Sequence, residues 1–300
     1  MALNYKELVN EIARNDESLH AVTDDEAIKL KDALYNMAID IDERLRPYGI
    51  KLMLVGGTLL GAVRHGGFIP WDDDFDAALS REDYLKLIDI FDEVLGEDYD
   101  LRSPNSPYPN GNRFMQIFKK GTVVKEFGSD NPFQPNELKI DIFPYDYAPD
   151  SAFFRKIKGI RANILMAIAA CVMDYRYTDE TYKQFMSQSS SGKRMYTIRR
   201  IIGFTFSFKK PEKWFDKVDI AIRTKKETNY VTSATGRKHY LGEIFETNVF
   251  YPVSEMKFIE HSFYAPAKPD VYLRGLYGDD YMTPPDAKQR ECHYIYEMKL

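Results

Sequence analysis

The stretch VGGTLLGAVRHGGFIPWDDDFDAAL, residues 55–79, holds most of the chemistry visible in this chain. It combines two glycine pairs, a neighbouring arginine and histidine, and four aspartates between residues 72 and 76. Glycine pairs permit tight turns and a close approach of the backbone to a ligand. Because DFDAAL alternates polar and apolar residues as a half-buried strand does, Asp74 and Asp76 are expected to point the same way.

The sequence on either side predicts alternating helices and strands. Thr23 and Glu26 form a capping box at the start of a helix that ends near Pro47. Residues 50–55 are predicted as a strand, 58–64 as a short helix, 81–95 as a helix capped by Ser80, and 113–120 and 137–146 as two further strands. This order predicts an α/β (α+β) fold, in which a mixed sheet flanked by helices is followed by a mainly helical second region.

Three aspartates are the best candidates for metal ligands. Side chains two apart on a strand lie about 6 to 7 Å apart on one face, so Asp74 and Asp76 can converge on one divalent cation. Asp141 is flanked by apolar residues in KIDIF, and a buried carboxylate needs a partner such as a metal ion. These oxygen ligands suit Mg²⁺ or Mn²⁺. Asp72 and Asp73 are less certain ligands, because Asp73 faces away from Asp74 if the strand has begun.

The first glycine pair would bring backbone amides close to phosphate groups, and the positive end of the helix at 58–64 would face the same space. Carboxylates, a metal ion and phosphate-binding amides together predict phosphoryl transfer. Each part alone has a plainer interpretation, because glycine pairs are common in turns and runs of aspartate are usually solvated. Neither a Walker nor a Rossmann glycine pattern occurs in the sequence.

Three segments resemble the LicD family, relatives of fukutin and the fukutin-related protein within the nucleotidyltransferase superfamily. They are GGTLLGAVRHGGFIPWDDDFDAALSREDYLKL (56–87), IDIFPYDYAP (140–149) and YLRGLYGDDYMTPPDAKQRECHY (272–294). The first segment is long and specific, and the two shorter ones follow in the expected order. The zinc-binding cysteine cluster of the animal relatives has no counterpart here. The resemblance implies a nucleotidyltransferase-like mixed sheet and transfer of phosphocholine, or a related phospho-alditol group, from a CDP-linked donor to a sugar hydroxyl.

The same resemblance implies roles for individual residues. Asp74 and Asp76 become metal ligands, and Asp141 becomes either a third ligand or the base for the acceptor hydroxyl. The implied phosphate loop comprises Gly56, Gly57 and Thr58.

Five more residues are candidates for binding the donor, each with a plainer alternative. Arg64 and His65 could neutralise the diphosphate or be a surface pair. Trp71 could be part of the core, or a platform for cytosine or a quaternary ammonium group. Arg290 and His293 could share one helical face that completes the donor site, or lie exposed on an ordinary C-terminal helix.

Charge divides the chain unevenly. Residues 151–240 hold 19 Lys and Arg against 7 Asp and Glu, whereas the remainder holds 22 against 39. We therefore expect a catalytic core at 1–150, a basic helical region at 151–240 that faces the acceptor or a membrane, and a segment at 241–300 that returns to the core. Within the basic region, residues 192–210 interleave cations with apolar residues, first at helical spacing and then in strand-like alternation. This segment suits an anionic membrane surface, the alternative being a solvated face over ordinary core residues.

Other features narrow the setting. Two cysteines, no glycosylation sequon and a charged N-terminus favour a cytoplasmic protein, peripheral at the inner face of the membrane if the basic region binds there. The longest apolar run, residues 164–173, is shorter than the roughly 18 residues that span a bilayer. No nucleic acid is expected as a partner, since no recognition motif occurs and the acidic remainder would repel a polyanion.

Three functions compete. The leading one is a Mg²⁺- or Mn²⁺-dependent transferase that uses CDP-choline, or CDP-ribitol, CDP-glycerol or CDP-ethanolamine, and a glycan or lipid-linked sugar acceptor. The second is a nucleotidyltransferase that attacks the α-phosphorus of an NTP and releases pyrophosphate. The third is a non-catalytic nucleotide- or glycan-binding protein with the same fold.

Overall fold

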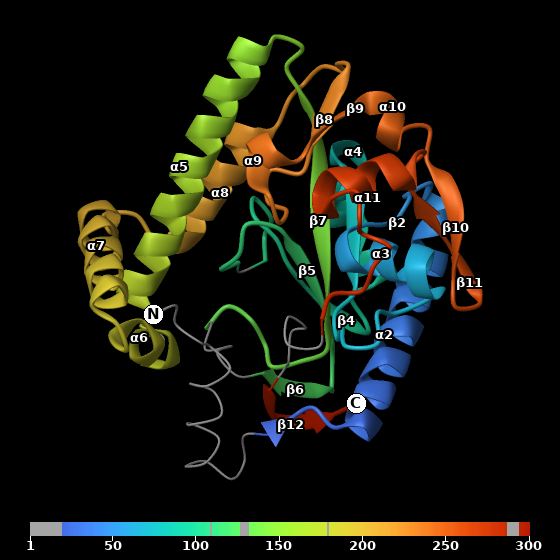
Figure 1. The fold of residues 1–300 in the computed structure, drawn as a ribbon, viewed down its shortest axis with the longest axis horizontal. Helices are drawn as coiled ribbons and strands as arrows, with labels where there is room; N and C mark the ends of the chain where they lie inside the picture. Colours follow the sequence, from blue (N-terminus) through green and yellow to red (C-terminus); the bar gives the residue numbers. More distant parts are fainter. Residues whose placement is uncertain (1–19, 109, 127–131, 179, 287–293) are drawn as a thin grey trace.

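The computed structural model describes residues 20–108, 110–126, 132–178, 180–286 and 294–300 (Figure 1). Within these residues a nine-stranded mixed sheet has the order β10-β11-β2-β3-β7-β5-β4, with β8 joined to β7 and β9 joined to β8. The strands are β2 (Met53–Leu54), β3 (Asp76–Ser80), β4 (Tyr99–Arg102), β5 (Met115–Lys119), β7 (Lys139–Ala148), β8 (Tyr230–Thr232), β9 (Ile244–Glu246), β10 (Ser254–Phe258) and β11 (His261–Ala265). The predicted mixed sheet flanked by helices is confirmed.

Strands β3 and β7 lie side by side at the centre of the sheet. They pair in parallel with Asp76 opposite Asp141, and the Asp141 N–H donates to the Phe75 carbonyl oxygen over 3.2 Å. Ala77, Ala78 and Leu79 of β3 are fully buried, as expected for a central strand covered on both faces. The pairing therefore brings two of the predicted acidic residues to one level of the sheet.

The helices before and after β3 begin where capping side chains satisfy their free backbone N–H groups. At the start of α2 (Asp24–Leu45) the predicted capping box is present, because Thr23 N–H donates to Glu26 over 2.9 Å and Glu26 N–H donates to Thr23 over 3.3 Å. At the start of α4 (Arg81–Val94) the Ser80 hydroxyl accepts from Asp83 N–H over 3.1 Å. Both helices bury an apolar stripe against the sheet.

Two boundaries near the glycines differ from the prediction. Helix α3 (Gly56–His65) starts at Gly56, so the first glycine pair forms the first helical turn instead of preceding it. Strand β3 starts at Asp76, which leaves Asp74 in the connection that enters it. Gly56 has a φ of 54°, a left-handed value that favours glycine. Gly56 therefore allows α3 to begin only two residues after the end of β2.

A helical arm occupies most of the basic region and consists of α5 (Ala152–Arg176), α6 (Glu180–Ser187), α7 (Ser190–Phe206) and α8 (Pro211–Ile222) (Figure 1). The strand-like alternation predicted near residues 204–208 is wrong, because α7 continues to Phe206. The chain is back in the sheet at β8, which pairs antiparallel with the end of β7. Among the described residues, no helix has the length and apolarity needed to cross a bilayer.

A buried ion network fastens the arm to the sheet. The Arg81 guanidinium on α4 donates to Asp146 of β7 over 2.6 and 2.9 Å and to Asp219 of α8 over 2.7 Å. Both carboxylates are at most 1% exposed. Asp219 also accepts from Asn105 over 2.8 Å. One cation therefore links a helix, the central strand and the arm.

The remaining elements bring the C-terminal part back to the core. Helix α10 (Thr247–Phe250) and helix α11 (Pro269–Tyr277) lie beside the sheet, and the short helix α9 (His239–Gly242) follows β8. A second sheet joins β1 (His20–Ala21), β12 (Tyr294–Lys299) and β6 (Val123–Glu126). Residues near the end of the sequence thus pair with a strand of the first half, and α11 packs on α3.

Candidate active site

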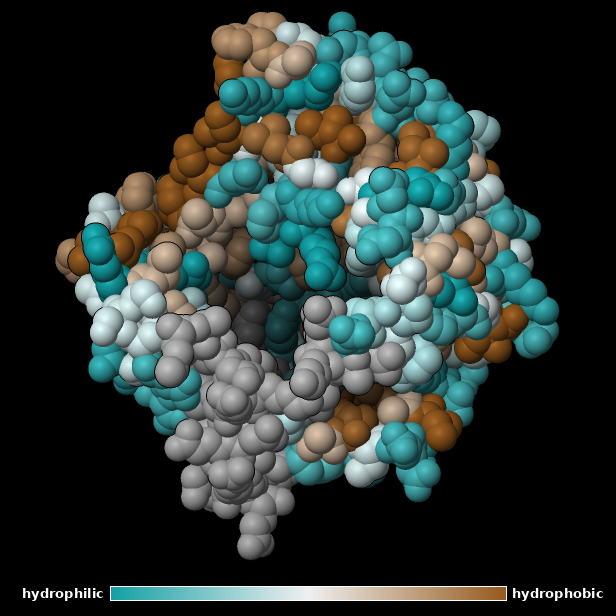
Figure 2. Space-filling view, in the orientation of Figure 1, coloured by the Kyte–Doolittle hydropathy of each residue, from teal (hydrophilic) through white to brown (hydrophobic). Residues whose placement is uncertain are grey.

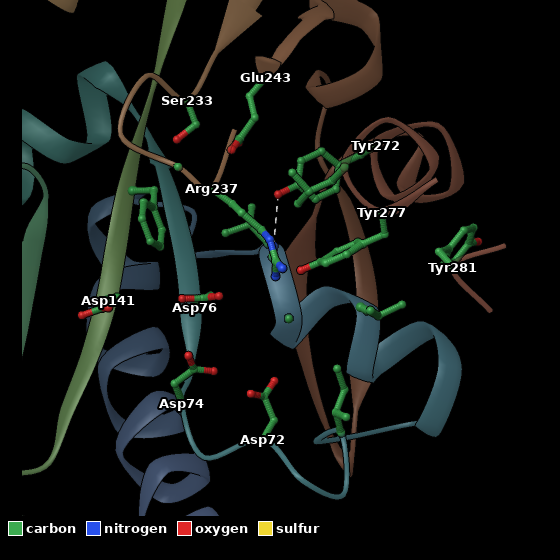
Figure 3. Close-up of a pocket in the computed structure, with 18 of the residues that line it drawn as sticks. Asp72, Asp74, Asp76, Asp141, Ser233, Arg237, Glu243, Tyr272, Tyr277 and Tyr281 are labelled. Carbon is green, nitrogen blue, oxygen red and sulfur yellow. Dashed lines mark hydrogen bonds between the residues drawn. The ribbon is translucent and has the colours of Figure 1, made fainter. Parts of the chain in front are cut away.

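A cavity of about 870 Å³ lies between α3, the central strands and α11 (Figure 3). Four separate parts of the sequence supply its walls: the α3 to β3 region, the sheet around Asp141, the segment at 233–243, and α11 with the residues after it. It collects the following predicted residues: Gly56, Gly57, Arg64, Trp71, Asp72, Asp74, Asp76 and Asp141. This cavity is the candidate active site.

Three aspartates form an acidic group on one side of the cavity, and Figure 3 shows Asp72, Asp74 and Asp76 turned toward the same space. Burial raises the pKa of Asp76 well above its ordinary value, and the nearby carboxylates raise it further. The Gly57 N–H, which donates to Asp76, opposes that rise. The acidic group thus stores electrostatic repulsion that a bound cation would relieve.

The first turn of α3 touches these carboxylates directly. A Cβ atom on Gly56 would lie 2.6 Å from the Asp76 carboxylate, and one on Gly57 would lie 2.8 Å from that of Asp72. The Gly56 N–H donates to the Tyr272 hydroxyl over 3.1 Å. Thr58 is buried, and its hydroxyl accepts from the Asp76 N–H over 2.7 Å. These residues position the acidic group, and their predicted contact with phosphate stays a prediction.

Asp141 has a hydrogen-bond partner of its own, and its charge also acts on Asp76. Gln116 of β5 donates to it over 2.8 Å, and in Figure 3 the Asp141 carboxylate points away from Asp76. Burial raises the pKa of Asp141, while Lys139 and the Gln116 hydrogen bond lower it. Its place beside the site is the predicted one, and its predicted role as ligand or base stays a prediction.

Three guanidinium groups line the same cavity. Arg64 donates to the Tyr281 carbonyl oxygen over 2.8 Å and lies 5.8 Å from the Trp71 ring. Arg113 donates to the Thr235 carbonyl oxygen over 3.2 Å. Arg237 lies over the Tyr277 ring, and Figure 3 shows it extending into the cavity. The cavity therefore combines positive charge with its acidic group.

His65 and Asp73 lie outside this arrangement. His65 is exposed and packs edge-on against Trp71 with ring centres 6.0 Å apart. Asp73 lines a small separate pocket beside Lys139, and not the main cavity. Asp74 and Asp141 line this small pocket as well, so the predicted opposite orientation of Asp73 stays a prediction. Arg290 and His293 lie outside the described residues.

The sequence did not point to the groups supplied by residues 233–243. Glu243 is buried, which raises its pKa to about 7, and its carboxylate accepts from Lys238 N–H over 2.7 Å. Ser233 and Thr235 are buried on the cavity wall, and among the described residues their hydroxyls have no hydrogen-bond partner. Only the pairing of β8 with β7 brings these residues to the site, and no local motif marks that pairing.

The acidic group suits Mg²⁺ or Mn²⁺ by its chemistry. Within the described ranges, no three carboxylate, imidazole or thiolate groups are close enough to hold one ion together. Mg²⁺ usually keeps several waters and is bound through one or two carboxylates together with substrate phosphates. Asp74 and Asp76 can supply these one or two carboxylates, since both line the cavity and both carry oxygen ligands.

The arrangement of three elements defines a nucleotidyltransferase-like domain. Helix α3 begins on glycines, the adjacent strand β3 begins on an aspartate, and the parallel strand β7 carries a further aspartate. Residues 49–157 match the family described as LicD/FKTN/FKRP, nucleotidyltransferase domain. The resemblance predicted from the sequence is confirmed, and residues 49–157 form a LicD-family domain.

Individual relatives agree with this assignment. The lipopolysaccharide cholinephosphotransferase LicD of Haemophilus influenzae is 25% identical over 253 residues, which cover 83% of this chain and 89% of that protein. The human ribitol 5-phosphate transferase FKRP is 51% identical over 101 residues, covering 34% of this chain and 18% of the human protein. An uncharacterized protein of Rickettsia typhi is 36% identical over 86 residues, 29% of this chain and 28% of its own length.

Proposed function

We propose that this protein is a phosphoryl-group transferase that acts on glycans. More specifically, we propose that it moves phosphocholine, or a related phospho-alditol group, from a CDP-linked donor to a sugar hydroxyl and releases CMP. The names of two relatives support the general proposal, since they describe transfer of cholinephosphate and of ribitol 5-phosphate. The residues that line the cavity support the more specific proposal of a CDP-linked donor.

The observation that carries the proposal is the presence of both signs of charge in one cavity. Its lining includes Asp74 and Asp76 together with three guanidinium groups: Arg64, Arg113 and Arg237. A diphosphate with its counter-cation needs both signs of charge, the carboxylates for the cation and the guanidinium groups for the phosphate oxygens. A site for a neutral sugar alone would require neither.

Asp74 and Asp76 would hold the divalent cation in this proposal. Bound there, Mg²⁺ or Mn²⁺ would supply positive charge that stabilises the transferring phosphoryl group. The arginines bind the non-bridging oxygens and keep the donor in line with the acceptor. Gln116 fixes one oxygen of Asp141, which leaves the other to take the proton of the acceptor hydroxyl.

Choline is the favoured head group because aromatic rings surround the cavity. Its lining includes Trp71, Phe114, Phe143, Tyr277 and Tyr281, together with the carboxylate of Asp280. Quaternary ammonium groups bind to the faces of such rings through cation–π attraction. An alditol, which carries hydroxyl groups instead of a charge, would gain less from this lining.

A donor screen tests the proposal. The full chain is incubated with Mg²⁺, an acceptor sugar panel and each of CDP-choline, CDP-ribitol, CDP-glycerol and CDP-ethanolamine, and CMP release is measured with Asp76→Asn as the control. We expect acceptor-dependent CMP release that is fastest with CDP-choline and lost in the variant. Pyrophosphate release from an NTP would instead make the protein a nucleotidyltransferase. Binding of a CDP compound without turnover on any acceptor would make it a binding protein.

A further inference from the structure

The helical arm carries most of the exposed apolar side chains of this protein. Of the eighteen large apolar side chains that are exposed in the described part of the chain, eleven lie between residues 153 and 208. On α5 four of them repeat at helical spacing: Phe153, Ile157, Ile160 and Ile164. Side chains three and four apart form one stripe on a helix surface, so this is an organised face of α5.

Helix α7 continues the apolar surface. Met195, Ile198, Ile201 and Phe204 are exposed on it, and Phe208 follows the helix with 71% of its surface exposed. Helix α7 packs tightly on α5, since a Cβ atom on Gly203 would lie 2.2 Å from the Cys171 carbonyl oxygen. Figure 2 shows the apolar side chains running along α5 toward α7 on one edge of the molecule. Isolated exposed apolar residues are normal, whereas a contiguous patch indicates an interaction surface.

Cations accompany this apolar face. Residues 151–210 hold twelve Lys and Arg against three Asp and Glu. The following exposed cations of the arm have no ion pair among the described residues: Lys156, Arg161, Lys193, Arg194 and Lys210. Arg199 and Arg200 differ, because Arg199 pairs with Asp174 over 2.6 Å and Arg200 donates to backbone carbonyls of α5. These two arginines hold the helices together, and the unpaired cations are the ones available to a partner.

We propose that the face formed by α5 and α7, residues 153–164 and 193–210, binds an anionic membrane surface. Apolar side chains enter the boundary between headgroups and acyl chains, while the neighbouring cations bind acidic headgroups. A second copy of this chain fits the face less well, because two copies would bring two strongly basic surfaces together. An anionic bilayer complements both the charge and the apolar character of the face.

This inference does not depend on the proposed function, because it concerns a different surface and is measured without turnover. The full chain is co-sedimented with vesicles of phosphatidylcholine alone and with vesicles containing phosphatidylglycerol, at low and high salt. We expect binding to the anionic vesicles only, and a loss of binding as salt screens the surface charge. No binding to anionic vesicles at low salt would overturn the proposal.

Two variants and one control locate the binding face. In the first, Lys156, Lys193, Arg194 and Lys210 are replaced by Ser, which should weaken vesicle binding about a hundredfold or more, since each cation contributes roughly 1 kcal/mol near an anionic surface. In the second, Ile201→Gln with Phe204→Gln removes apolar area and should also weaken binding. The control replaces four lysines far from the arm, Lys29, Lys51, Lys257 and Lys268, by Ser.

The control should bind vesicles as the unchanged protein does, and thermal unfolding checks that every variant is folded. An equal loss in the control would show non-specific charge attraction and overturn the assignment to this face. Sedimentation velocity without vesicles supplies the remaining outcome. A dimer that Ile201→Gln with Phe204→Gln converts to a monomer would assign the face to a second copy and not to a membrane.

Discussion

At the scale of single residues, the site depends on carboxylates that pack directly against the backbone of two glycine residues. Gly56 and Gly57 let the first turn of α3 approach Asp76 and Asp72 more closely than any other residue would allow. Burial, and after it the like charges of neighbouring carboxylates, raises the pKa of Asp76. Repulsion of this kind is tolerated at sites that bind a cation, because the ligand supplies the missing charge.

Replacing the acidic residues separates activity from stability. We expect Asp74→Asn and Asp76→Asn each to lower turnover at least about a hundredfold, because each removes a charge that holds the cation at the reacting phosphate. The free energy of unfolding of the metal-free Asp76→Asn protein should be unchanged or higher, since a repelled, buried carboxylate is lost. Steady-state kinetics and urea unfolding measure the two effects. Near-normal turnover with metal still required would remove these residues from the site.

Gly56→Ala tests the close approach, with Gly49→Ala as a matched control. Both glycines have positive φ, but a Cβ atom on Gly49 meets nothing within 4 Å. The left-handed backbone should cost each variant about 1 to 2 kcal/mol of stability, and only Gly56→Ala must also displace Asp76. We therefore expect turnover to fall in Gly56→Ala and to persist in Gly49→Ala. Equal kinetics in the two variants would show that close packing on Asp76 is not required.

Glu243 predicts a pH dependence of stability. Its pKa is raised from 4.5 to about 7 by burial, so the folded state holds its proton more strongly than the unfolded state does. The stability from this group is complete below about pH 4.5 and is lost as pH rises toward 7. Glu243→Gln should therefore show a smaller fall in unfolding free energy than the unchanged protein between these values. Denaturant unfolding at several pH values, with exposed Glu227→Gln as control, measures the difference, and parallel pH profiles would contradict it.

At the scale of helices and strands, local signals mark where elements begin, and long-range contacts decide what they do. The capping side chains of Thr23 and Ser80 predict the starts of α2 and α4, since capping depends only on neighbours in sequence. The start of α3 was predicted two residues late, at Thr58, because glycine pairs are typical of turns and the contact of Gly56 with Tyr272 joins distant parts of the sequence. The strand-like alternation after residue 204 was overridden by packing of α7 on α5.

Arg81 on α4 links this helix to β7 and to α8. Arg81→Met should lower the free energy of unfolding by about 3 to 5 kcal/mol, because Asp146 would stay buried without its cation. Lys183→Met, which removes one partner of an exposed ion pair on α6, is the control and should leave stability unchanged. Urea unfolding monitored by circular dichroism measures both. A small loss in Arg81→Met would mean that water or a rearranged side chain compensates Asp146.

At the scale of the whole molecule, the cavity joins residues that lie more than two hundred positions apart in the sequence. Asp74, Asp76 and Asp141 could be predicted because each lies in a strand-like pattern that is visible locally. Arg237 and Glu243 could not, because they reach the cavity only after β8 pairs with β7. Arg113 lies at the start of the strand predicted at 113–120, but nothing in that pattern marks it as a residue of the cavity. About half of the residues that line this cavity come from distant segments that are brought there by the fold. Their spacing in the sequence gives no sign of this contact.

The pairing of β7 with β8 also has a consequence for how such proteins diversify. Ala148 and Tyr230 are partners in register, so the entire arm begins and ends at adjacent points of the sheet, and the family match stops at residue 157, soon after α5 begins. The entropy of closing a loop grows only with the logarithm of its length, and doubling the length costs roughly 0.6 kcal/mol. Changes in the length of the outer arm therefore cost the core little chain entropy, provided that Asp219 of α8 still pairs with Arg81. Natural selection can change what the arm contacts while the reaction chemistry beneath it is inherited intact.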